Sequence, residues 1–257
     1  MNGPREEIES WRLSTEMFRD SEDVGSWRPS GLGWDGQSLL TTASDAVGTV
    51  PENYEPRYAY PLIVWLCDED CGSAQAMDHI ANLSPQNYVG LALENAALPK
   101  RMSPQDPRDA LVVSLKHLVA IENRIAAVVR DFRQTVHVHS ERVFLAGAGH
   151  AATTAMLIAM HQPDWFSGCM TFGGKYPAEA GVLVRRRRLV GPRFWVSAPK
   201  FDRPSNYGES AMHAARQLIA AGADVTTHLH TGSRLVTRSA LIELDRWIIS
   251  GILAEAG

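Results

Sequence analysis

A glycine-rich turn in residues 143–151, VFLAGAGHA, joins an apolar run of strand length to a segment with helical character. A sharp turn from a strand into a helix can raise one side chain above a sheet, which suits a nucleophilic hydroxyl or thiol. At the position where that side chain would stand the sequence has Gly149, and His150 follows it. The turn therefore has the strand-turn-helix order that positions a nucleophile, but Gly149 has no side chain that could attack a substrate.

The segment CDEDC, residues 67–71, gathers two thiols and three carboxylates. Zinc sites usually have Cys-x₂-Cys spacing with a second pair of ligands, and the calcium loop of an EF hand has its own pattern. The segment matches neither pattern, so we predict that the chain binds no metal and uses no cofactor. We interpret the segment as an acidic loop at a helix N-terminus, where negative charge is favourable.

Three further patterns could carry chemistry, but the surroundings expected for each argue against it. The histidine pairs 137/139 and 228/230 each place two imidazoles on one face of an extended segment, at strand ends that we expect to lie far apart. Ser210, in the segment GESAM, follows a polar loop, whereas a nucleophile turn needs a preceding strand. The four arginines at 185–188 are typical of a solvated charged surface.

Strands and helices alternate along most of the sequence. Apolar runs of strand length lie at residues 60–67, 87–93, 142–148, 167–172 and 192–198, an alternating run lies at 224–230, and a short strand pair is expected within 38–50. Helical spacing is found at 74–83, 110–134, 151–161, 208–222 and 235–253. This order predicts an α/β fold with a mostly parallel central sheet and helices on both faces.

We expect a single α/β domain over residues 36–257, preceded by an N-terminal extension at residues 1–35. The extension is polar, but Trp11, Trp27 and Trp34 argue against a wholly disordered tail, because such tails are poor in large aromatic residues. No internal repeat and no linker between domains is visible in the remainder of the sequence.

The composition restricts the partner and the compartment. The chain has 257 residues, 45% of them hydrophobic, and a net charge of −4, so its charge favours neither nucleic acid nor an anionic membrane as partner. Three cysteines make no disulfide framework in a chain of this length, which indicates a reducing compartment, the cytoplasm. The charged N-terminus lacks the apolar segment of a signal peptide, and no apolar run is long enough for a membrane span.

The order of these elements, the glycine-rich turn, the segment HQPDWFSG at 161–168 and the segment APKFD at 198–202 resemble the α/β-hydrolase superfamily. Within it, the chain is most similar to the phospholipase/carboxylesterase group and to polyhydroxybutyrate-depolymerase-like esterases, over residues 45–255. The resemblance implies an α/β-hydrolase fold. It also implies a serine on the turn, backbone donors for an oxyanion after an early strand, and then an acid and a histidine later in the chain.

Carried over position by position, the resemblance implies a degenerate active site. The serine position falls on Gly149, and the family's His-Gly step at the oxyanion loop falls on Cys67 and Asp68. The acid position matches at Asp202, and the histidine position falls on Ser233. His230 could substitute for it if the register shifts.

We therefore predict a pseudoenzyme that lacks the nucleophile and the histidine and acts as a ligand-binding or partner-binding scaffold. The residues expected around its cleft are Cys67, Asp68, His150, Asp202 and His230. Its partner would be a small molecule, another protein or a second copy of the chain. The alternative is an active carboxylesterase or phospholipase-type hydrolase whose nucleophile has moved, with Ser233, Ser197 or Cys67 as candidates.

Overall fold

The computed structural model of the chain describes residues 38–41, 46–98, 107–177, 189, 191–201 and 206–256. All of them belong to one compact unit, Gly31–Gly257. The predicted extension at residues 1–35, the arginines at 185–188 and Asp202 lie outside the described residues. The single-domain boundary at residue 36 stays a prediction.

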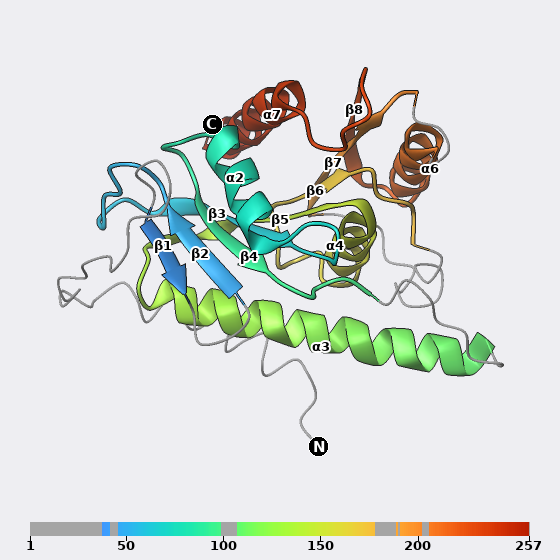
Figure 1. Ribbon diagram of the computed structural model, residues 1–257, viewed down its shortest axis with the longest axis horizontal. Helices are drawn as coiled ribbons and strands as arrows, with labels where there is room; N and C mark the ends of the chain where they lie inside the picture. The colour runs from blue at the N-terminus through green and yellow to red at the C-terminus, as the bar shows by residue number, and fades with distance from the viewer. Residues whose placement is uncertain are drawn as a thin grey trace. The chain divides into compact units, whose positions relative to one another are not determined.

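The described residues contain one eight-stranded sheet in the order β1-β2-β4-β3-β5-β6-β7-β8, shown in Figure 1. The strands and their bounds are β1 (Ser38–Thr41), β2 (Ala46–Val50), β3 (Tyr60–Leu66), β4 (Val89–Leu93), β5 (Val138–Ala148), β6 (Gly168–Phe172), β7 (Arg193–Pro199) and β8 (Asp224–His230). The β1–β2 and β2–β4 pairs are antiparallel, and every pair from β4 through β3 to β8 is parallel. The predicted mostly parallel sheet is confirmed.

Helices cover both faces of the sheet (Figure 1). On one face lie α3 (Pro107–Arg133), α4 (Gly149–His161) and α6 (Tyr207–Ala220), and on the other lie α2 (Ser73–Leu83) and α7 (Arg238–Ala256). Covering both faces explains why every residue of β3 and β4 is buried, since such central strands read as continuous apolar runs. In contrast, β8 is an edge strand and has several exposed residues.

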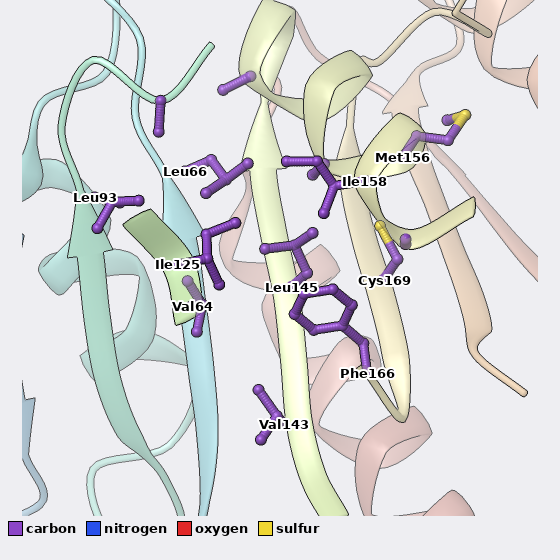
Figure 2. Packing of buried hydrophobic residues seen from close by; sticks show 14 of the residues in the cluster. Val64, Leu66, Leu93, Ile125, Val143, Leu145, Met156, Ile158, Phe166 and Cys169 are labelled. Atoms are coloured by element: carbon purple, nitrogen blue, oxygen red, sulfur yellow. The ribbon is translucent and has the colours of Figure 1, made fainter. Parts of the chain in front are cut away.

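The helix α4 packs on β5 and β6 and contacts α3, and its side chains are apolar on almost all sides. Every residue from 151 to 160 except Thr153 is buried. Figure 2 shows Met156 and Ile158 of α4 packed with Leu145 of β5 and Cys169 of β6. This packing holds the amino end of α4 at the carboxyl edge of the sheet, where β5 ends.

None of the helices in the described parts of the chain is both long enough and apolar enough to cross a membrane.

A buried acid–histidine pair joins α3 to α4. Glu122 on α3 has only 4% of its surface exposed. One carboxylate oxygen lies 2.7 Å from Nδ1 of His161, and the other accepts a hydrogen bond from Nε2 of Gln162 at 3.2 Å. Removing one partner from a buried carboxylate leaves charge that neither water nor protein compensates fully.

We expect His161→Ala to lower the free energy of unfolding by roughly 1–3 kcal/mol, measured by urea denaturation. In a Glu122→Leu background the same substitution should cost much less, because no buried carboxylate remains to lose its partner. The matched control is Arg246→Ala, which removes an exposed ion pair to Glu243 at 2.6 Å and should change stability by at most about 0.5 kcal/mol. Equal losses from the buried and the exposed pair would contradict this account.

Candidate functional site

The turn from β5 into α4 is sharp and has an unusual backbone. Ala148 is still extended, with φ −119° and ψ 150°, and Gly149 has a positive φ of 59°. Residues with side chains rarely adopt such an angle, and positions of this kind cluster at functional sites. The turn is thus the strained strand-to-helix connection that the sequence predicts, and glycine relieves its strain.

Gly147, two residues before Gly149, is required for a different reason. A Cβ atom built on it would lie 2.8 Å from the backbone carbon and oxygen of Ala151 and 2.9 Å from the nitrogen of Ala152. These are backbone atoms of α4, which cannot move aside without moving the helix. The absence of a side chain at Gly147 therefore permits the close approach of α4 to β5.

Two side chains from distant loops border Gly149. A Cβ atom built there would meet Cδ1 of Leu235 at 3.6 Å and Oδ2 of Asp68 at 4.0 Å. Leu235 comes from the connection between β8 and α7, and Asp68 comes from the turn between β3 and α2. The surroundings of Gly149 therefore combine an aliphatic group with a carboxylate.

The Asp68 carboxylate is held by three backbone amides. Its Oδ2 accepts a hydrogen bond from the Ala151 amide in the first turn of α4, at 3.2 Å. Its Oδ1 accepts from the amides of Asp70 and Cys71 at 2.9 and 3.1 Å. The amino end of a helix favours an anion, because unpaired amides and the helix dipole both point toward it. In this chain the anion at α4 is supplied by the protein itself.

The acidic loop therefore caps a helix, but not the one that follows it in sequence. The helix that begins next is α2, and its N-cap, Gly72, makes no side-chain hydrogen bond. Its first residue, Ser73, donates from both its amide and its hydroxyl to Glu94, at 3.3 and 2.6 Å. The tertiary fold thus brings Asp68 to α4, a helix far along the chain from the acidic loop.

His150, predicted to line the cleft, is engaged by the backbone. Its Nε2 makes a short hydrogen bond with the carbonyl oxygen of Leu98, at 2.5 Å, just beyond β4. Its side chain is half-buried. This nitrogen is therefore committed to a contact within the chain.

The predicted late histidine position, Ser233, is exposed to solvent. His230, its predicted substitute, is 7% exposed, and its Nε2 lies 3.3 Å from the carbonyl oxygen of Leu235. Within this connection it is Leu235, two residues after Ser233, that packs against Gly149 and also against Gly173. Sequence reasoning missed Leu235, since an isolated leucine in a loop carries no chemical signal.

Comparison with known proteins identifies the fold. The carboxylesterase from Mesorhizobium loti has a TM-score of 0.60 and 12% identity, over 84% of this chain and 99% of that one. The carboxylesterase from Bacillus cereus has a TM-score of 0.59 and 13% identity, over 80% of this chain and 93% of that one. S-formylglutathione hydrolase from Staphylococcus aureus has a TM-score of 0.59 and 10% identity, over 84% and 96%.

The chain has the α/β-hydrolase fold. No protein-family model matches the sequence, and no curated protein matches it. The likeness therefore lies in the arrangement of the elements, and the chemistry of the site depends on the residues of this chain.

The structure also places the other side chains singled out in the sequence of this α/β-hydrolase fold. The histidines 137 and 139 lie at the amino end of β5, whereas 228 and 230 lie at the carboxyl end of β8, the edge of the parallel sheet at which the β5–α4 turn also lies. Ser210 is in the first turn of α6, where its amide donates to the carbonyl of Asn206 at 3.0 Å. Among the described residues, no group of three or more His, Cys, Asp or Glu could hold a metal ion.

The two glycines of the turn predict losses of stability of different size when a methyl group is added. Gly147→Ala should lower the free energy of unfolding by roughly 2–4 kcal/mol, because the methyl overlaps the α4 backbone. Gly149→Ala has room for its methyl and should cost only the backbone strain of a positive φ, roughly 1–2 kcal/mol. Urea denaturation of both variants measures the difference, and a larger cost at Gly149 would contradict the geometry described.

Proposed function

We propose that this chain is a catalytically degenerate α/β-hydrolase-fold protein that binds a small molecule or a protein partner and does not hydrolyse esters. In this proposal Gly149 occupies the position of the nucleophilic serine. The observation that carries the proposal is the contact of Gly149 with Leu235 and Asp68. An aliphatic group and an anion border the place where a hydrolase needs a histidine base and an oxyanion-binding site.

The absent nucleophile is the first support. Glycine has no atom that could form an acyl intermediate. Removing the serine of a serine protease costs about 10⁶ in turnover, which corresponds to roughly 8 kcal/mol of transition-state stabilisation. Leu235 cannot take a proton, so the base would be missing as well even if another group supplied the attack.

The Asp68 carboxylate is the second support. Acyl transfer places negative charge on the carbonyl oxygen, and hydrolases stabilise it with amides at the amino end of this helix. Here Asp68 already accepts the Ala151 amide. An oxyanion forming about 4 Å away would be disfavoured by about 4 kcal/mol at an effective dielectric constant of about 20.

The relocated nucleophiles of the alternative hydrolase lack a base in the described residues. Ser197 is 0% exposed, and its hydroxyl has no hydrogen-bond partner. Ser233 is exposed and makes no hydrogen bond to a histidine among these residues. The pKa of the Cys67 thiol is raised by the neighbouring Cys71 thiol and by burial, which disfavours the reactive thiolate. These observations favour the non-hydrolytic proposal over the active one.

We also propose that the protein works in a reducing compartment such as the cytoplasm. Cys67, Cys71 and Cys169 are all free and buried. Free thiols are usual where glutathione and thioredoxin keep cysteines reduced.

The proposal predicts that the wild-type protein is not labelled by a serine-reactive fluorophosphonate and does not hydrolyse 4-nitrophenyl acetate above the rate in buffer. Gly149→Ser combined with Leu235→His should restore labelling, because it returns a hydroxyl and an imidazole to adjacent positions. Adding Asp68→Asn should increase labelling further, since the repelling charge is removed. Mass spectrometry of the labelled peptide identifies the modified residue.

The matched control is Gly149→Ala combined with Leu235→His, which adds similar bulk without a hydroxyl and should stay unlabelled. Labelling of the wild-type protein at one residue, lost in the alanine variant of that residue, would establish the hydrolase instead. A folded serine–histidine variant that stays unlabelled would count against the assignment of Gly149 and Leu235 to the catalytic positions.

A further inference from the structure

The turn between β3 and α2 brings two thiols together. Cys67 follows β3 directly, and the chain then folds back so that Asp68 and Cys71 form an isolated antiparallel bridge. The Cys71 amide donates to both the carbonyl oxygen and the Oδ1 of Asp68, at 3.4 and 3.1 Å. Each thiol shifts the pKa of the other, upward at Cys67 and downward at Cys71. The fold therefore places the two cysteines at the two ends of a short turn that is closed by the Asp68–Cys71 bridge.

The third cysteine is separated from this pair by the sheet. Cys169 on β6 is 0% exposed and lies among apolar side chains on the α3/α4 face, as Figure 2 shows. Cys67 belongs to the apolar cluster on the opposite face. Within the chain, therefore, the sulfur that Cys67 can reach is that of Cys71.

The pair is placed for contact with small molecules in solvent. Cys71 is 6% exposed and Cys67 is 0% exposed. Glu69 and Asp70, at the tip of the turn, are exposed, as is Gly72. A reagent that reaches the tip meets Cys71 first and Cys67 behind it.

The two thiols also differ in their chemistry. Their interaction lowers the pKa of Cys71 and raises the pKa of Cys67. Burial and the charge of Asp68 oppose the lowering at Cys71. Because Cys71 is the more exposed of the two thiols and the thiolate is the attacking form, Cys71 is the first nucleophile and Cys67 is the resolving thiol.

We infer that Cys67 and Cys71 form a dithiol–disulfide redox site, oxidised by a small disulfide of neutral or positive charge, and that its oxidation releases Asp68 from the amino end of α4. The charge preference follows from Asp68, Glu69 and Asp70, which surround the pair in the turn and repel an anionic reagent.

The exchange proceeds in two balanced steps. The Cys71 thiolate attacks one sulfur of the small disulfide, the S–S bond of the reagent breaks, and one thiolate leaves and takes up the proton lost by Cys71. Cys67 then loses its proton and attacks the Cys71 sulfur of the mixed disulfide, and the second reagent thiolate leaves with that proton. Two protein thiols are oxidised to one disulfide, and one reagent disulfide is reduced to two thiols.

The link to α4 runs through Asp68, which lies between the two cysteines. A disulfide requires the Cβ atoms of its cysteines to lie about 3.5–4.5 Å apart in a restricted geometry. In the reduced form the Asp68 carboxylate accepts the amides of Ala151, Asp70 and Cys71 at once. Tightening the turn alters the two local contacts and, with them, the contact with Ala151.

The first test treats the folded protein with cystamine, a cationic disulfide, and then alkylates the free thiols under denaturing conditions. Residues 58–100 contain both Cys67 and Cys71 and no internal Lys or Arg, so both lie in one tryptic peptide. We expect two of the three thiols to resist alkylation and this peptide to lose the mass of two hydrogen atoms. Glutathione disulfide, which is anionic, should react several-fold more slowly at low salt, and high salt should reduce the difference.

Variants separate the two roles. Cys67→Ser should stop at a stable cystamine adduct on Cys71, Cys71→Ser should react far more slowly, and Cys169→Ser should behave like the wild type. Retention of all three alkylatable thiols in the wild-type protein would overturn the redox site, as would a disulfide that includes Cys169. A reaction that is faster with glutathione disulfide would overturn the charge preference.

The second test follows amide hydrogen exchange in the reduced and the oxidised protein. The Ala151 amide, which donates to Asp68, should exchange several-fold faster after oxidation. The amide of Gln162, which donates to the carbonyl oxygen of Ile158 at 2.8 Å at the far end of α4, should not change. An unchanged Ala151 amide in protein that carries the disulfide would refute the coupling to α4. Neither test depends on esterase activity, so both are independent of the proposed function.

Discussion

The hydrogen bond from the Ala151 amide to the Asp68 carboxylate is the interaction on which the site depends. It joins the turn after β3 to the amino end of α4, more than eighty residues later in the chain, at 3.2 Å. An isolated carboxylate so close to buried groups would be costly, but here three amides and a helix dipole compensate its charge. If Gly149 occupies the nucleophile position, as proposed, the same contact places a negative charge where an acyl-transfer enzyme must stabilise one.

The close packing of α4 against the sheet makes that interaction possible. Gly147 leaves no side-chain atom between β5 and the Ala151 backbone, and the buried side chains of α4 hold the helix against the sheet and α3. This packing fixes the amino end of α4 relative to the sheet, and the loops at the carboxyl edge of the sheet pack around it. Leu235 from the β8–α7 connection and Asp68 from the β3–α2 turn reach Gly149 from two of these loops.

The fold and its function are separable in this protein. Its neighbours are carboxylesterases and an S-formylglutathione hydrolase, yet at 10–13% identity they share an arrangement of strands and helices and little else. A fold supplies a scaffold, and the side chains at one edge decide the chemistry. The proposed loss of hydrolysis follows from the side chains around the β5–α4 turn. The proposed dithiol site follows from the side chains of the neighbouring β3–α2 turn.

Much of the fold could be predicted from the sequence because its signals are local. The continuous apolar runs became β3, β4, β5, β6 and β7, and the helical spacing at 110–134 became α3 (Pro107–Arg133). The start of α4 was predicted two residues late, at 151, since a glycine and a histidine are weak helix-start signals. Gly149 could be located from the sequence alone, because an apolar strand, a glycine-rich turn and a helix are adjacent in the chain.

The surroundings of Gly149 were decided by tertiary structure. Spacing in sequence predicts Ser233 or His230 at the late histidine position, and in the fold it is Leu235 of the same β8–α7 connection that borders Gly149. The acidic loop precedes α2 in the sequence, whereas Asp68 caps α4. Local residue patterns determine strands, helices and the absence of a hydroxyl at the turn. Contacts between loops far apart in the chain depend on how the sheet assembles, and only the folded protein specifies them.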